Sequence, residues 1–226
     1  MRQTAMQDGE IDERSGESGG GRAAPRLRVM RPAPVIETAR GYWQGLRVGR
    51  NLPRRDALDP KDMGTILAHA MILDRVRPGT VRIRLAGRVI NSLLGMDARG
   101  LPLHALFEPR DRTRLEPLIE TVFDRPATLE CDGLSEGAEG IMGARLLLLP
   151  LLDRCYAPSK ALGVVVTDRP VQDPPRRFSM TCHELRDTDA PAPDRQPLPT
   201  DRFPEMAPAP RFEARETQVP WLRVVK

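Results

Sequence analysis

The sequence predicts one small α+β domain over about residues 35–170, between two segments whose composition predicts disorder. A chain of 226 residues has room for one ordinary domain plus extensions. Only 40% of the residues are apolar and 4% are aromatic, yet the spaced apolar patterns gather in the middle of the chain. These patterns run in the order helix, helix, strand, strand, helix, helix and three strands, which favours an α+β domain over alternating βα units.

Both ends of the chain have compositions that bury little apolar surface. Residues 1–34 combine glycine and polar residues with almost no spaced apolar ones, which predicts a disordered leader. Residues 171–226 are rich in proline, which removes backbone donors and predicts a disordered tail. Residues 219–225 are an apolar exception, and they either dock back on the domain or serve as a short linear motif.

The charges are mixed along the chain. A formal net charge of +4 comes from 35 basic and 31 acidic residues, too diffuse to indicate a nucleic-acid-binding protein. A basic cluster in the leader would give some non-specific affinity for nucleic acid through counterion release; it consists of Arg22, Arg26, Arg28 and Arg31. No aromatic platform or recognition helix accompanies it, so a solubilising arm is the favoured interpretation and a nucleic-acid partner is not expected.

Cysteine usage and hydropathy indicate a cytoplasmic protein. The three cysteines are odd in number and widely spaced, and no cleavable apolar leader precedes them, so reduced thiols are the simplest interpretation. Residues 146–152 form the longest apolar run, far below the roughly 20 residues of a membrane span. The spacing does not predict a zinc site, because paired ligands are missing among Cys131, Cys155, Cys182 and His183.

The first half of the domain reads as two helices and a hairpin. Apolar residues recur at helical spacing over residues 36–46 and include Trp43, so this helix is either a lid on the core or, through Tyr42 and Trp43, a homodimer contact. Asp59 followed by Pro60 begins a second short helix that runs to about residue 68. Two short apolar runs, residues 71–76 and 81–85, flank a proline-glycine turn and predict a hairpin.

The second half reads as two helices and three strands. Residues 87–94 predict a helix that Gly95 ends, and the apolar stripe over residues 115–123 predicts another. Pro117 either kinks this second helix or begins a new one after Glu116. The predicted strands are residues 127–131, 144–152 and 162–167.

Several short motifs together carry a resemblance to a known family. They are Tyr42–Trp43, the segment Leu52-Pro53-Arg54-Arg55, Asp59–Pro60, residues 82–87, Gly95 and Gly100. Over about residues 43–168 the chain resembles the stand-alone PAS-like domain family of alphaproteobacteria, long catalogued as a domain of unknown function. The resemblance implies a five-stranded antiparallel sheet with helices on one face and a role in signal sensing or protein docking. It implies no enzyme and supplies no binding residues.

No motif of an enzyme or of a resident cofactor is present in the sequence. Nucleophile elbows, zinc-protease motifs and phosphate-binding glycine loops do not occur. PAS folds bind haem through an axial histidine, and His104 and His69 are the two candidates near the predicted pocket. No cysteine follows the second strand where flavin photochemistry would need one. We therefore expect no cofactor and no metal.

The sequence thus predicts a non-enzymatic sensory or docking module that regulates signalling by contacting another protein, such as a sensor kinase. The alternative is a sensor of a small ligand or haem that acts through self-association. A small apolar ligand would lie under the sheet, in a pocket that we expect to be formed by Leu85, Ile90, Leu94, Leu106, Leu147 and Val164. The same positions are also the inward-facing set of a dry core, and the dry core is the favoured interpretation.

Overall fold

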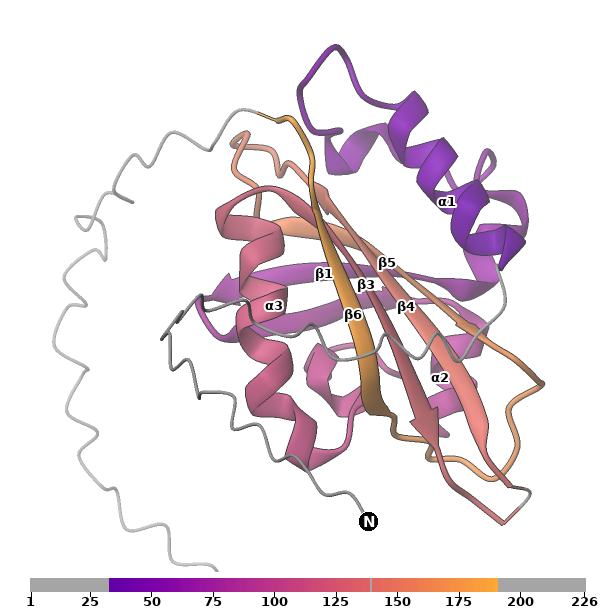
Figure 1. Cartoon of the computed structure of the whole chain (residues 1–226). Helices are drawn as coiled ribbons and strands as arrows, with labels where there is room; N and C mark the ends of the chain where they lie inside the picture. Colours follow the sequence, from indigo (N-terminus) through magenta and orange to yellow (C-terminus); the bar gives the residue numbers. More distant parts are fainter. Residues whose placement is uncertain (1–32, 139, 191–226) are drawn as a thin grey trace, which may run out of the picture. The chain divides into compact units, whose positions relative to one another are not determined.

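The computed structural model describes residues 33–138 and 140–190. Its centre is a six-stranded antiparallel sheet in the order β2-β1-β5-β4-β3-β6 (Figure 1). The strands are β1 (Ala70–Arg77), β2 (Thr80–Ala86), β3 (Ala127–Ser135), β4 (Met142–Leu151), β5 (Lys160–Thr167) and β6 (Ser179–Asp187). The expected α+β fold is confirmed, with six strands where five were predicted.

One face of the sheet, called the inner face here, is covered by most of the helices. They are α2 (Arg88–Leu94), the 3-10 helices η3 (Leu103–Leu106) and η4 (Pro109–Asp111), and α3 (Arg112–Asp124). Their apolar side chains pack on alternate residues of the strands, among them Leu73, Leu129 and Leu148, and form the larger of two cores.

The opposite face, called the outer face here, is covered in part by α1 (Pro34–Gly45) (Figure 1). With η1 (Arg55–Ala57) and η2 (Gly64–His69), α1 encloses a second core whose sheet residues include Leu147, Leu162 and Val164. Helices therefore lie on both faces of the sheet, where the resemblance implied one. Because β4 and β5 are apolar on both sides, a second layer of helix is needed to bury them.

Local backbone chemistry explains where the first elements differ from the prediction. The predicted hairpin is present, and Gly79 occupies its turn at a φ of 74°. The helix expected to begin after Asp59 is instead a turn followed by η2. Gly64, the first residue of η2, has a φ of 46°, so no continuous right-handed helix runs from Asp59 into η2. The Asp59 carboxylate accepts a hydrogen bond from the Lys61 amide across 2.8 Å.

The glycine expected to end α2 does so, whereas the proline expected to disturb α3 lies within a continuous helix. Gly95 ends α2 in the left-handed conformation, as predicted. Pro117 lies inside α3, which continues through it from Arg112 to Asp124, so this residue does not begin a new helix.

The ordered sheet extends beyond the boundary drawn at residue 170. Strand β6 lies in the segment whose composition predicted disorder, and it pairs with β3 along the edge of the sheet. Phe178 and Met180 are buried in the inner core. Average composition misses β6 because prolines on both sides of it dominate the count. The leader arginines and residues 219–225 lie outside the described residues.

Among the residues that the structure describes, no helix is long and apolar enough to span a membrane.

Candidate functional site

The six residues predicted to line one pocket are distributed over three environments. Ile90, Leu94 and Leu106 belong to the inner core, whereas Leu147 and Val164 belong to the outer core. Leu85 is 48% exposed on the outer face.

Strand geometry is the reason for this distribution. Side chains alternate between faces, so Leu147 lies on the opposite side from its inward neighbours Leu146 and Leu148. A register shift after Ile72 places Leu85 opposite Ile72 on the outer face. The alternation along β2 predicted this leucine to point inward, and that prediction is wrong.

The interior under strands β3, β4 and β5 is closely packed around Cys131 and Leu146. A residual cavity of about 10 Å³ remains there, lined by Leu106, Phe107, Cys131, Gly133, Ala144, Leu146, Val165 and Phe178. This volume is about that of a single water probe, far below the ~300 Å³ at which pockets for drug-sized ligands begin. This part of the inner face therefore acts as a core, and a ligand at this place would require the side chains or helices around it to move.

The two histidines proposed as haem ligands occupy different places. His104 lines a pocket of about 150 Å³ with Arg112 and Glu116. Burial lowers the pKa of His104, the charge of Arg112 lowers it further, and Glu116 opposes both. The Nδ1 atom of His69 lies 2.9 Å from the carbonyl oxygen of Val165. The His104 pocket is too small for a macrocycle, so His104 and its neighbours in that pocket do not fit haem.

An apolar groove opens on the outer face between η2 and the β1–β2 hairpin. Its volume is about 180 Å³, and we call it the outer groove; it is lined by Arg55, Leu58, Pro60, Met63, Leu67, Ala70, Met71, Ile72, Leu85, Ala86 and Gly87. Leu67 is 46% exposed and Leu85 48% exposed. Two large apolar side chains half open to solvent beside one hollow distinguish this surface from scattered exposed residues.

Charged groups border the outer groove along β1. The Asp74 carboxylate accepts hydrogen bonds from Arg84 across 2.7 Å and from Lys160 across 2.5 Å. Burial alone would raise the pKa of Asp74, but these two cationic donors outweigh it and the pKa is lowered. The groove thus has an apolar floor beside a row of paired charges.

The aromatic pair of α1 is not an exposed dimer contact. Trp43 is 3% exposed within the outer core, and Tyr42 is half-buried with its hydroxyl accepting a hydrogen bond from the Asp59 amide across 3.0 Å. Of the two predicted roles of this helix, the structure supports the lid over the core. The side chains of α1 instead position the η1–η2 segment that forms one wall of the outer groove.

The cysteines do not converge on a metal site. Cys131 is buried on the inner face, and burial raises the pKa of its thiol to about 12. Cys182 lies opposite Asp132 on the neighbouring strand, and Cys155 is exposed in the β4–β5 loop. Within residues 33–138 and 140–190, no three metal-ligating side chains group together.

Sequence reasoning missed the outer groove. Leu67 and Leu85 were each assigned to an apolar pattern, and an apolar pattern normally predicts burial. The shift in register that exposes Leu85 leaves no signal in the sequence. The proline-glycine turn and alternation of β2 located the hairpin correctly but not this detail of its pairing.

Solved structures with PAS and LOV domains resemble the chain at low identity. The LOV protein of Rhodobacter sphaeroides is 17% identical over 49% of this chain and 69% of its own, with a TM-score of 0.37. A PAS domain from Colwellia psychrerythraea is 17% identical over 48% of this chain and 98% of its own, with a TM-score of 0.36. The LOV domain of the blue-light photoreceptor Aureochrome1 is 18% identical over 49% of this chain and 88% of its own, with a TM-score of 0.35.

A search of curated proteins finds no match. The model of the PAS domain family, by contrast, matches residues 30–166, which is more than half of the chain. That match spans α1 and the strands β1 to β5, and it ends one residue before the end of β5. The chain belongs to the PAS domain family.

Proposed function

We propose that this PAS domain is a non-enzymatic docking module that regulates signalling by binding another protein, such as a sensor kinase, through the outer groove. The observation that carries the proposal is the half exposure of Leu67 and Leu85 around one apolar hollow. The proposed compartment is the cytoplasm, where the three free thiols would stay reduced.

The energetics of the outer groove favour a protein side chain as its occupant. Fully burying one leucine stabilises a contact by about 1.5–3 kcal/mol, so covering Leu67 and Leu85 would supply a large part of a modest affinity. The hollow is sized for an anchor of one or two side chains rather than for a drug-sized molecule.

Charge at the rim indicates what the partner presents. Arg55 lines the outer groove, and Arg84 borders it while paired to Asp74. A partner segment with an apolar anchor and a neighbouring carboxylate would match both features, because the carboxylate can meet the guanidinium group of Arg55.

A paired comparison of variants tests this function. Leu85→Glu places a charge in the outer groove, while Val48→Glu also replaces an apolar side chain by glutamate, at a residue that is 80% exposed and outside the groove. We expect Leu85→Glu to abolish co-purification of the partner from native cells and Val48→Glu to preserve it, with circular dichroism showing both folded. Equal retention by the two variants would contradict docking through the groove.

The alternative is a small-ligand sensor that acts through self-association, and the pocket beside His104 is the observation that favours it. Native mass spectrometry of the full chain separates the two functions. An additional mass that leaves on denaturation would support the ligand sensor, and the mass of the polypeptide alone would support docking.

A further inference from the structure

The edge of the sheet at β6 is covered where this strand begins. Among the described residues, β3 is the only strand that pairs with β6. On the other side, the Phe178 amide donates a hydrogen bond to the Leu106 carbonyl across 2.9 Å, and the Phe178 carbonyl accepts one from the Glu108 amide across 3.0 Å. The Met180 amide donates to the Asp111 carboxylate across 3.2 Å. The segment that precedes α3 therefore covers the edge as far as residue 180.

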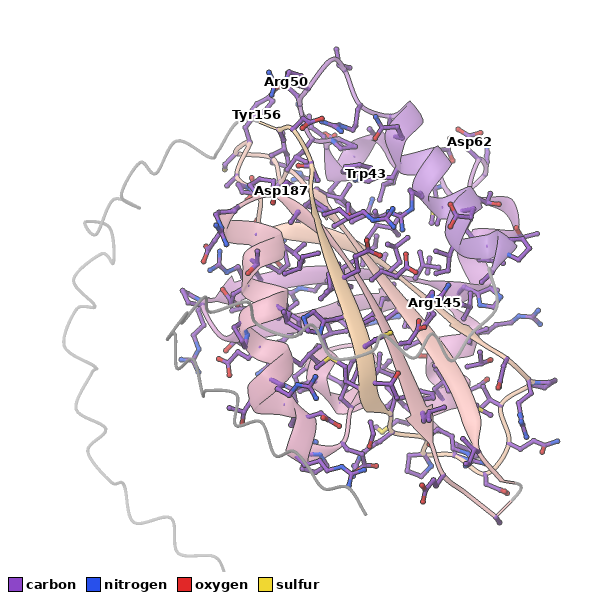
Figure 2. All side chains as sticks on the ribbon, in the orientation of Figure 1. Trp43, Arg50, Asp62, Arg145, Tyr156 and Asp187 are labelled. Carbon is purple, nitrogen blue, oxygen red and sulfur yellow. The ribbon has the colours of Figure 1, made fainter. Side chains whose placement is uncertain are left out.

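The second half of β6 directs backbone groups away from β3. The amide of Thr188, directly after β6, donates a hydrogen bond to the carbonyl oxygen of Pro126 across 3.1 Å. Residues of an antiparallel strand alternate between bonding one neighbour and facing the other side, so residues 184 and 186 also bond toward β3. The N–H and C=O groups of Leu185 therefore point away from β3, as do those of residues 183 and 187. Figure 2 shows Asp187 beside the upper end of β6, at the border of the sheet. We call residues 183–187 the β6 edge segment.

Two opposite charges flank a leucine at the centre of the β6 edge segment. Glu184 and Arg186 share the outer face and form an ion pair of 3.0 Å, and their side chains are 27% and 50% exposed. Leu185 lies on the inner face between them, partly buried against the inner core. The segment therefore carries one charge of each sign on one face and a half-buried apolar side chain on the other.

An edge strand whose backbone groups point outward is a template for a further strand. A second copy of the same segment can pair with it antiparallel about a twofold axis, so that both copies use the same surface. The residue that lies on the axis decides which side chains face each other. An axis at residue 184 would bring two Glu184 side chains together, and an axis at residue 186 would do the same to two Arg186 side chains, so like charges disfavour both.

An axis at Leu185 gives the complementary register. Each Glu184 then faces Arg186 of the second copy, while each charge keeps its partner on its own strand. These two positions are not hydrogen-bonded to each other across the axis, which is where facing side chains lie closest. Residues 183, 185 and 187, whose backbone groups point outward, form the hydrogen-bonded pairs. This register also pairs the whole β6 edge segment with itself, because Leu185 is its central residue.

We propose that two copies of this chain form a homodimer by pairing their β6 edge segments antiparallel about Leu185, so that one sheet continues through both copies. The buried Trp43 of α1 takes no part in this contact. The outer groove lies at the other end of the sheet, beside β1 and β2, so it stays accessible in both copies. The inference goes beyond docking by one protomer, because the dimer presents two outer grooves and forms without a ligand.

Charge reversal at the two facing positions tests the dimer in the full chain. Glu184→Arg places an arginine opposite Arg186 of the second copy, and Arg186→Glu places a glutamate opposite Glu184. Sedimentation equilibrium at about 10–200 µM should show a dimer of the unsubstituted chain, and each variant should raise the dissociation constant of the dimer by about tenfold or more. Arg82→Glu, an equal charge change on the opposite edge strand β2, is the control and should leave this constant unchanged.

Mixing the two variants tests the register. The Glu184→Arg chain has arginine at both facing positions and the Arg186→Glu chain has glutamate at both, so an axis at Leu185 makes the two chains complementary. An equimolar mixture should form a heterodimer whose dissociation constant is within about threefold of that of the unsubstituted dimer. Such recovery also shows that neither variant dissociates through misfolding, and circular dichroism checks the fold of each chain alone.

Three results would overturn the proposed pairing. The first is an unsubstituted chain that stays monomeric over this concentration range. The second is unchanged self-association of both charge-reversal variants, because the two copies would then meet at another surface. The third is a mixture of the variants that associates no better than either variant alone.

Amide hydrogen exchange gives an independent readout at single residues. The Leu185 amide points away from β3 and gains a hydrogen bond in the dimer, whereas the Glu184 amide bonds toward β3 in both states. Raising the concentration of the unsubstituted chain should slow exchange at Leu185 by about tenfold or more and at Glu184 by less than about twofold. An equal change at the two residues would contradict pairing along this edge.

Discussion

The indole Nε1 of Trp43 donates a hydrogen bond to the carbonyl oxygen of Pro150 across 2.9 Å, and this bond fixes α1 on the sheet. Pro150 belongs to β4, so the contact joins residues 107 positions apart within the outer core. Since the indole is buried and its donor is satisfied, this residue holds the lid in place.

Replacing Trp43 should therefore destabilise the whole domain. Trp43→Phe keeps an aromatic ring but leaves the buried carbonyl of Pro150 without its donor, which should lower the free energy of unfolding by about 1–3 kcal/mol. Trp43→Ala should lower it by about 3–5 kcal/mol. Urea denaturation measures both, with Val48→Ala as a control expected to change stability by less than about 0.5 kcal/mol. A Trp43→Ala variant as stable as this control would show that α1 does not depend on the indole.

Alanine substitutions at two glycines, Gly87 and Gly41, should change the stability of the domain in opposite directions. A Cβ atom at Gly87 would lie 2.4 Å from the carbonyl oxygen of Leu67 and 2.5 Å from that of Ala68, whereas a Cβ at Gly41 would meet nothing within 4 Å. We expect Gly87→Ala to cost about 1–3 kcal/mol by pushing η2 away from β2. Gly41→Ala, inside α1, should stabilise by about 0.5–1 kcal/mol. Thermal unfolding of the two variants checks the signs, and a neutral Gly87→Ala would contradict the close packing of η2.

The ion pairs of Asp74 predict a pH dependence of stability. The pKa of this carboxyl is lowered in the folded state, so its contribution is fully present above the unfolded pKa of about 3.9 and is lost as the pH falls through the folded value. Asp74→Asn should thus be less stable than the unsubstituted chain at pH 7, and the difference should shrink below about pH 4. Unfolding free energies measured from pH 7 to pH 3 test this. A difference that stays constant over the range would mean that the carboxylate charge is not responsible.

Strand β6 should be essential for the inner core. A chain of residues 33–170 lacks Phe178 and Met180, both buried in that core, and exposes the edge of β3. We expect it to be less stable than residues 33–190 by at least about 3 kcal/mol, the usual cost of losing one buried phenylalanine. Denaturation curves and binding of an apolar dye compare the two chains. Equal stability of the two chains would mean that the folded domain ends near residue 170, as the composition of the sequence predicted.

Much of the fold follows from local signals in the sequence. Gly79 and Gly95 mark a turn and a helix end, and the helical stripe over residues 115–123 lies within α3. These predictions hold because each rests on backbone preferences and periodicity, which act over a few residues.

Features that depend on pairing between distant segments could not be predicted in this way. The exposure of Leu85 depends on a register shift against β1, and the placement of β6 depends on the free edge of β3. The apolar run of β4 revealed burial on both sides but not which helix would cover each. The outer groove is formed by contacts between segments that are distant in the sequence, so no single sequence pattern predicts it.

Site-specific photo-crosslinking at residue 85 is the most direct test of docking through the outer groove. A photoreactive amino acid replaces Leu85 in the full chain within native cells, and the same substitution at Val48 is the control, since that side chain is exposed elsewhere. We predict one discrete protein adduct from position 85, no such adduct from position 48, and loss of the first when Leu67→Glu is added. No adduct at position 85, or the same adducts at both positions, would contradict the proposed docking function.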